Sequence, residues 1–185
     1  MKQHRSVKIP RRLTSFIVLP LLACLVCACT AIDRREPGVY WGDNKLEFDI
    51  SGAIRDQKLI RDENVSVTAF NGTVLLTGQA QDQLDIDVIF DIAKGHQDAQ
   101  RVFNRLEISE VLNPINREKD SLITARVKTQ IALVAPLIST RIKVITEQAN
   151  VYLMGLVTSE EADVAVEAAG SVSGVVRIIK VFEYI

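Results

Sequence analysis

From about residue 45 to residue 185, the chain carries one pattern twice. Residues 64–78 align without a gap on residues 141–155, with apolar positions and a final glycine in register. A repeat of this length indicates two small domains of one fold. At about 70 residues each, the domains are near the lower size for independent folding, so we expect some packing between them.

The second copy shows most clearly the spacing of apolar residues that is typical of helices and strands. Apolar residues at the spacing of one helical face predict a helix, with Asp120 or Ser121 as its N-cap. Alternation then predicts strands at 142–146 and 151–153 around a turn at 147–150, followed by a helix from Ser159 and a strand at 175–184. The helix residues expected to face the core are Ile123, Val127, Ile131 and Val134.

The first copy has the same order of elements. We expect a helix from about Lys45, strands at 65–69 and 73–77 around the turn Asn71 and Gly72, a helix at 81–94 and a strand at 99–108. The order αββαβ therefore occurs twice. It predicts the α+β class, with two tandem sandwich domains that each carry helices on one face of a small sheet.

The domain boundaries follow from the breakers between these segments. The first domain is expected at 45–112 and the second at 119–185. Between them, residues 113–118 contain Pro114 and two asparagines and are expected to form a linker. Residues 29–44, with Pro37, two glycines and several charges, are expected to form a tether, although Tyr40 and Trp41 are too apolar for a spacer alone.

Residues 1–28 have the features of a secretory signal. Five basic residues and no acidic residue precede an apolar run at 16–26, which is broken only by Pro20. The run is short for a membrane span, which needs about 20 residues, and it ends in small residues as a signal does. A permanent anchor helix is the less favoured alternative.

The end of this segment, residues 26–29, resembles a bacterial lipobox. That resemblance implies that the Cys29 thiol is lipidated and that Cys29 becomes the mature N-terminus. Cys24 also fits the pattern, but Cys29 follows the whole apolar run and directly precedes polar residues. Thr30, and not an aspartate, follows Cys29, which by lipoprotein sorting in Gram-negative bacteria implies the outer membrane.

Removal of the signal makes the protein acidic. The full chain has 22 basic and 23 acidic residues, and all five basic residues of the signal would be lost. An acidic chain argues against nucleic acid as a partner. The excess charge lies in the first copy, because residues 44–112 hold seven basic and twelve acidic residues whereas 117–185 hold eight of each. Only the second copy is therefore expected to approach an anionic membrane without strong repulsion.

The repeated unit resembles the BON domain. The second copy is the better match, at 142–144, at 151–158 and at the segment Val-Ser-Gly-Val of 172–175. Two departures are Asp98, where the family often has glycine, and residues 148–150, which replace an Asn-Gly type of turn. The resemblance implies binding of anionic phospholipid, a contribution to envelope integrity, and neither catalysis nor a cofactor.

One helical face differs between the copies. In the second copy a stripe well away from the core face offers two leucines to insert into a membrane and a cation for a headgroup. We predict that it binds phospholipid; the alternative is that its leucines pack on the first repeat or on the linker. By the resemblance, Leu122 occupies the position where the similar family member carries an aromatic residue, which implies a lower affinity here. The stripe is Leu122, Arg126, Thr129 and Leu133, and its counterpart in the first copy is Lys45, Asp49, Gly52 and Asp56.

Enzyme constellations are weak in this sequence. His96, the only histidine after the signal, is expected to be a solvated loop residue, and no catalytic or metal site is predicted. An acidic series more often marks a solvated helix face. A protein–protein adaptor or chaperone-like module, using sheet edges or Tyr40 and Trp41, is the alternative function, and a hydrolase is a distant third. The acidic series is Asp82, Asp85, Asp87 and Asp91.

Overall fold

A computed structural model describes residues 33–57, 64–109 and 114–185. Arg34–Ile185 forms one compact unit. The predicted signal at 1–28, with Cys24, and the predicted lipid anchor Cys29 lie outside the described residues. Within the described part, no helix is long and apolar enough to cross a membrane.

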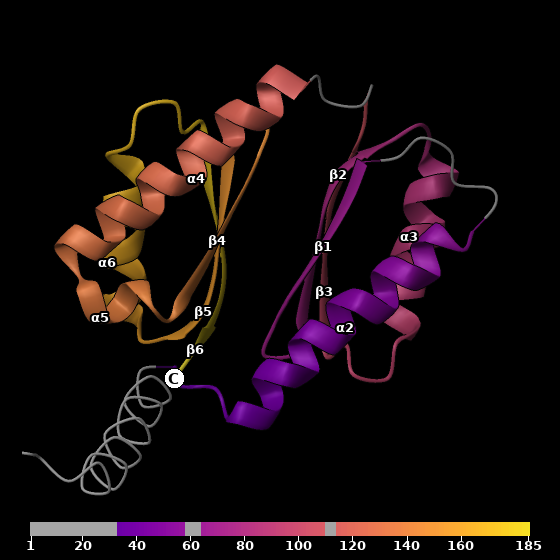
Figure 1. Ribbon diagram of the computed structural model, residues 1–185, viewed down its shortest axis with the longest axis horizontal. Helices are drawn as coiled ribbons and strands as arrows, with labels where there is room; N and C mark the ends of the chain where they lie inside the picture. Colours follow the sequence, from indigo (N-terminus) through magenta and orange to yellow (C-terminus); the bar gives the residue numbers. More distant parts are fainter. Residues whose placement is uncertain (1–32, 58–63, 110–113) are drawn as a thin grey trace, which may run out of the picture. The chain divides into compact units, whose positions relative to one another are not determined.

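The first domain consists of two helices and a three-stranded sheet (Figure 1). In the sheet, β1 pairs antiparallel with β2, and β2 pairs parallel with β3. A parallel pair needs a crossover connection, which α3 provides. The elements are α2 Pro37–Arg55, β1 Asn64–Phe70, β2 Thr73–Ala80, α3 Gln83–Gly95 and β3 Arg101–Ile108.

The second domain repeats this order and pairing. Here β5 is the central strand, antiparallel to β4 and parallel to β6. The predicted fold class and the order αββαβ are confirmed in both copies, with one short helix, α5, that the sequence pattern did not predict. The elements are α4 Pro114–Val134, α5 Pro136–Ser139, β4 Ile142–Glu147, β5 Asn150–Val157, α6 Ser159–Gly170 and β6 Arg177–Tyr184.

The first helix begins at Pro37, so the predicted start near Lys45 was wrong, and residues 37–44 of the predicted tether at 29–44 are helical. Proline suits the first helical position because its missing N–H would have no partner there. The preceding Arg35 also packs on the domain. Its guanidinium lies over the rings of Tyr40 and Phe70 and forms an ion pair of 2.9 Å with Asp43.

The helix of the second copy likewise begins at Pro114, before the predicted start. The predicted linker at 113–118 is therefore mostly helical, and Asp120 and Ser121 lie inside α4 and not at its N-cap. At the other end, Val134 is 56% exposed and does not face the core, contrary to prediction. The three other predicted core residues, Ile123, Val127 and Ile131, are buried.

A buried aspartate from the first helix stabilises the strand turn in each domain. The Asp43 carboxylate accepts hydrogen bonds from the backbone N–H groups of Asn71 and Gly72, at 2.8 and 2.9 Å. The same bonds recur one repeat later, from Gln148 and Ala149 to Asp120, at 2.9 and 2.8 Å. All four turn residues have positive φ. The turn geometry is therefore shared by both copies, although only the first has an Asn-Gly pair.

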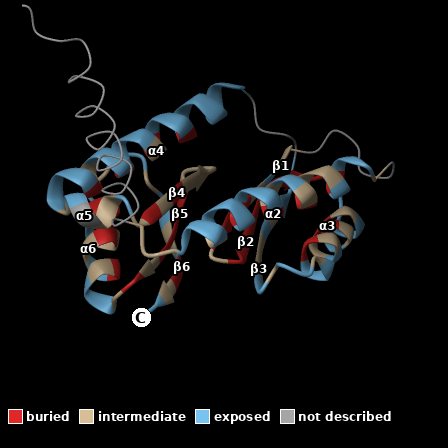
Figure 2. Ribbon diagram, turned by 60° about the horizontal axis from the view of Figure 1, so that its bottom comes forward, coloured by how far each residue is buried: buried red, intermediate tan, exposed pale blue. Residues whose placement is uncertain are grey.

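Each sheet packs its helices on one face, as expected, and the other face of each sheet is also buried. An apolar cluster on these second faces joins the two domains through Phe70, Leu75, Tyr152, Met154 and Val181. Strand β2 is buried along its whole length, and β5 along all but one residue (Figure 2). The two sheets thus form a shared core, which supports the expectation that the domains pack together.

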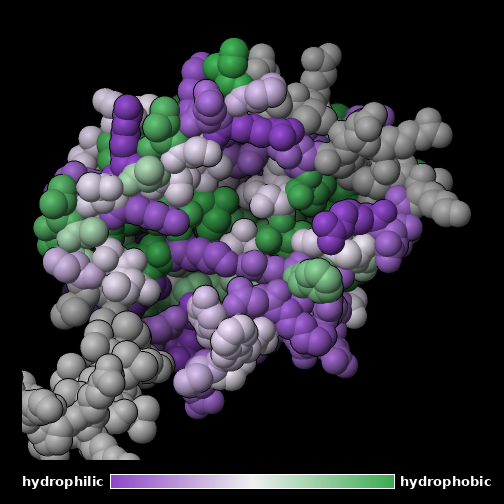
Figure 3. Space-filling view, in the orientation of Figure 1, coloured by the Kyte–Doolittle hydropathy of each residue, from purple (hydrophilic) through white to green (hydrophobic). Residues whose placement is uncertain are grey.

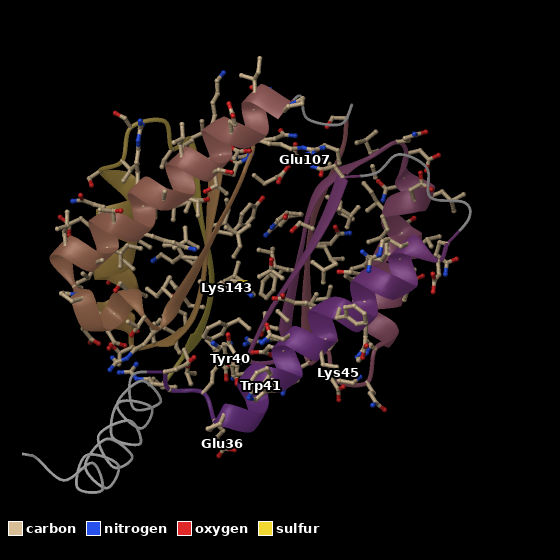
Figure 4. The ribbon with its side chains drawn as sticks, in the orientation of Figure 1. Glu36, Tyr40, Trp41, Lys45, Glu107 and Lys143 are labelled. Atoms are coloured by element: carbon tan, nitrogen blue, oxygen red, sulfur yellow. The ribbon has the colours of Figure 1, made fainter. Side chains whose placement is uncertain are left out.

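Polar contacts surround this shared core. The Lys143 ammonium forms an ion pair of 2.5 Å with Glu47, whose carboxylate also accepts a hydrogen bond from the N–H of Ala69 (Figure 4). The side-chain amide of Gln79 donates to Glu147. Burial raises the pKa of Glu147, because its charged form is poorly solvated there.

Candidate phospholipid-binding surface

The four residues of the predicted lipid-binding stripe lie on the outer surface of α4. Leu122 is 56% exposed and Leu133 is 73% exposed, and Arg126 and Thr129 are exposed as well. The core residues Ile123, Val127 and Ile131 hold the opposite side of the helix against the sheet and α6. More than half of the surface of each leucine is exposed, which argues against the alternative that they pack on the first repeat or on the linker.

The exposed side of α4 carries more cations than the sequence analysis recognised. Beside Arg126, three further basic residues are exposed, and the exposed acidic residue of this helix is Glu118, since Asp120 is buried. In the described part of the chain, no ion pair joins any of these cations to a carboxylate. The three further residues are Arg117, Lys119 and Lys128. By the helical period, Lys119 and Arg126 lie on the side of the two leucines, so their charges are available to an external anion there. Arg117 and Lys128 lie more than about 100° round the helix from Leu122, and Arg117 acts electrostatically on Glu147.

Thr129 contributes less than its position suggests. Its hydroxyl donates a hydrogen bond of 2.9 Å to the backbone carbonyl of Ala125, within the same helix. That proton is not available to a lipid phosphate. The apolar and cationic parts of the surface therefore come from Leu122, Leu133 and the basic residues, with Thr129 as a small spacer.

A groove of about 760 Å³ adjoins the first half of this surface. The α4 side chains Lys119, Leu122 and Arg126 line one side of it, and Gln148 of the strand turn and Ser173 of the loop before β6 line the other. The groove thus combines two cations and polar groups with an apolar wall. Hydrophobic and hydrophilic side chains are interspersed over α4 in the space-filling view (Figure 3).

The equivalent position on the first domain is electrostatically different. Lys45 forms an ion pair with Asp49, one turn further along α2, and this hydrogen bond holds the pKa of the Asp49 carboxyl below its usual range. The Nε2 atom of His96 lies 3.6 Å from Asp49, and its side chain is 21% exposed. His96 is therefore packed against α2 and is less solvated than we expected.

The acidic series of the first domain lies at the N-cap of α3 and along that helix. Asp82 is the N-cap of α3, and its side chain accepts the N–H of Asp85. Within the described residues, no group of three histidine, cysteine, aspartate or glutamate side chains is placed to hold a metal ion.

Comparison with known proteins identifies the repeated unit. The BON domain matches this chain twice, at residues 42–110 and 119–185. The chain belongs to the BON-domain family. The second matched range begins at residue 119, inside α4, so the surface described above, apart from Arg117, lies within the second BON domain.

Two relatives extend over most of the chain. The outer membrane lipoprotein DolP of Haemophilus influenzae is 34% identical over 161 residues, which cover 86% of this chain and 83% of DolP. A 21 kDa hemolysin of Actinobacillus pleuropneumoniae is 31% identical over 155 residues, which cover 83% of this chain and 80% of the hemolysin. The C-terminal domain of CdsD from Chlamydia trachomatis superimposes with a TM-score of 0.32 at 10% identity, covering 76% of this chain and 97% of that domain.

The relationship to DolP confirms the localisation expected from the N-terminal residues. The protein is an outer-membrane lipoprotein with two BON domains. It therefore belongs to the envelope of a Gram-negative bacterium.

Proposed function

We propose that this protein helps to maintain the outer membrane by docking its second BON domain on anionic phospholipid. The observation that carries the proposal is the outer face of α4, where the exposed Leu122 and Leu133 accompany Lys119 and Arg126. Neither cation forms an ion pair with a carboxylate in the described part of the chain. Apolar groups enter the membrane interface and cations neutralise lipid phosphates, which is how interfacial helices bind. The second domain supplies both, and the first domain carries the excess of acidic residues.

The expected free energy of binding suits reversible docking. Complete burial of a leucine side chain contributes about 1.5–3 kcal/mol. Leu122 and Leu133 have more than half of their surface left to bury, so they contribute roughly 2–4 kcal/mol together. Each basic residue near an anionic surface adds about 1 kcal/mol. This is enough to orient a domain that is already held at the membrane, and too little to insert it permanently.

The anchor in this proposal is a lipidated Cys29. A Cys29→Ser variant should lose incorporation of labelled fatty acid and leave the membrane fraction. Cys24→Ser is the matched control, and it should keep both properties. If Cys24→Ser is the variant that loses the label, the anchor lies at Cys24 and the prediction for Cys29 was wrong.

Vesicle sedimentation tests the role of α4. The chain from residue 30 is suitable, because Arg34–Ile185 is a compact unit with its own cores. Binding to phosphatidylglycerol vesicles should exceed binding to phosphatidylcholine vesicles, and both Leu122→Glu and Arg126→Glu should reduce it at least tenfold. Lys180→Glu is the matched control, because it changes the charge by as much as Arg126→Glu does, but on β6. It should bind as the unchanged protein does. Equal binding by all four proteins would exclude docking through α4.

The proposal includes no catalytic step. It assigns α4 and its groove to the recognition of a surface, with Lys119 and Arg126 as the cations that meet lipid phosphates. Cells in which the only copy of this protein carries Leu122→Glu should become more permeable to large antibiotics. The amount of the protein in the outer membrane should be unchanged. Unchanged permeability would separate lipid binding from envelope integrity.

A further inference from the structure

The first domain carries an exposed aromatic face of its own on α2. Because the helix begins at Pro37, Trp41 and Phe48 both lie on it, and their spacing of seven residues places them on one side. Trp41 is 72% exposed and Phe48 is 71% exposed. Leu46 and Ile50 are buried on the opposite side of the helix.

Two cations lie close to the line that runs along α2 through Trp41, and the nearest acidic residues, Asp49 and Asp56, border it at about 60–80°. At about 100° per residue, Lys45 and Arg55 fall within roughly 40° of the line through Trp41. Lys45 is well exposed, although it is paired with Asp49 at the border of this face. Arg55 forms no ion pair with any carboxylate in the described part of the chain. We call the residues Trp41, Lys45, Phe48 and Arg55 the α2 face.

These aromatic side chains keep most of their surface exposed among the described residues. Trp41 contacts the ring of Tyr40 edge to face, with 5.9 Å between centroids, and Tyr40 is itself half exposed. Trp41 and Lys45 project from the first turns of α2 in the view with side chains (Figure 4). Exposed large apolar groups that gather on one face mark an interaction surface.

The chain before α2 favours a membrane as the partner of this face. Only eight peptide units separate the predicted anchor Cys29 from Pro37. Because a fully extended chain spans at most about 3.6 Å per residue, the start of α2 stays within about 30 Å of the lipid-bearing cysteine. Tryptophan prefers the headgroup level of a bilayer, where its ring is apolar and its N–H stays hydrated. Trp41 is the only tryptophan of the chain.

We infer that the α2 face is a second membrane contact, in which Trp41 and Phe48 enter the interface of the leaflet that holds the lipid anchor. The inference rests on the anchor of the proposed function but not on lipid binding by α4. It also differs in chemistry. The aromatic side chains act on lipids of any headgroup charge, whereas the cations of α4 select anionic lipids. The α2 face therefore adds contact strength, and α4 adds selectivity.

Quenching of the single tryptophan tests this inference directly. The lipidated full protein is reconstituted in phosphatidylcholine vesicles that contain brominated acyl chains, and its fluorescence is compared with that in unbrominated vesicles. We expect quenching of Trp41 and a shift of its emission to shorter wavelength. The double variant Leu122→Glu, Arg126→Glu should be quenched as strongly, because Trp41 reports on α2 alone.

One further variant and a control complete the experiment. Phe48→Glu should reduce the quenching several-fold, whereas Asp163→Lys, on α6 of the second domain, should leave it unchanged. Quenching that disappears in the α4 double variant would overturn the inference, because Trp41 would then only follow the docking of α4. The inference would also be overturned if the vesicles leave Trp41 unquenched and it is shielded from solvent only when envelope protein is added. That result would favour a protein partner. Failure of the phosphatidylglycerol test for α4, with Trp41 still quenched, would remove the proposed function and leave this inference standing.

Discussion

The buried carboxylate of Asp120 is expected to stabilise the second domain although it lies in the middle of a helix. We consider the variant Asp120→Ala. It removes the acceptor for the N–H groups of Gln148 and Ala149, and it changes no residue of the turn itself. The Asp120 side chain is nearly fully buried, so water does not replace the carboxylate without rearrangement.

The expected loss follows from the two hydrogen bonds. A hydrogen bond to a charged group contributes about 1.5–3 kcal/mol to the free energy of unfolding. Gln148 and Ala149 are partly exposed, so their N–H groups reach water once the turn shifts, and the lower part of that range applies. The total is therefore about 2–4 kcal/mol. At about 2–4 °C per kcal/mol for a protein of this size, the melting temperature should fall by roughly 5–15 °C.

Thermal unfolding followed by circular dichroism measures this loss, and hydrogen exchange assigns it. The amides of Gln148 and Ala149 should exchange faster in Asp120→Ala, and those of Asn71 and Gly72 should not. Asp163→Ala is the control, because Asp163 is an exposed residue with only a long contact to Lys180. If Asp120→Ala melts within 1 °C of this control, the account of the turn is wrong.

Three further changes test other parts of the fold. Ala149→Gly should raise the free energy of unfolding by about 0.5–1 kcal/mol, because a residue with a Cβ atom is strained at the φ of 59° found there; unchanged urea midpoints would contradict this. Gly78→Ala should cost more than about 2 kcal/mol, because an added Cβ atom would lie 1.7 Å from the backbone oxygen of Asn64; a normal melting temperature would refute the close approach. Glu147→Gln should raise the melting temperature at pH 7.5, because burial raises the pKa of Glu147 and its charged form therefore opposes folding. Protonation relieves the same penalty in the unchanged protein, so the difference should vanish as the pH falls below about 4, and a difference that persists there would argue against a titration effect.

The sequence predicted the order of elements because its periods are undisturbed where the core forms. Ile123, Val127 and Ile131 repeat at helical spacing and are all buried. The helix starts were not predictable in the same way. The cap residue Glu36 forms no side-chain hydrogen bond to the helix, so it gives no signal. Asp120 gives a false signal, because its carboxylate binds the turn and not the helix end.

The sequence also contains a signal for the contact between the domains, but it was overlooked because these strands were identified by alternation of apolar and polar residues. Residues 74–76 and 151–154 are continuous apolar runs, which are typical of strands that are buried on both faces. Leu75, Tyr152 and Met154 lie on the face that joins the two sheets. The run indicates burial, but it does not identify the partner, because the other domain is distant in sequence.

The exposed face of α4 was predictable from helical period alone, since its position depends only on where the core residues lie. The groove beside it was not, because Gln148 and Ser173 approach α4 only when the sheet forms. The α2 face was missed for a different reason. With the helix expected from Lys45, Trp41 fell outside it and its alignment with Phe48 could not be recognised.

The sheet-to-sheet core also explains which surfaces of the two copies were free to change. Each domain offers its partner the same face of the same sheet, so the interface has approximate two-fold character, as in a homodimer whose subunits share one patch. Duplication and fusion of one such subunit would produce this arrangement. After fusion, the two copies of each helix were encoded separately. The exposed face of one copy could therefore change without the same change in the other. A symmetric pair can present only two equal surfaces, whereas the fused pair exposes leucines and cations on α4 and aromatic residues on α2.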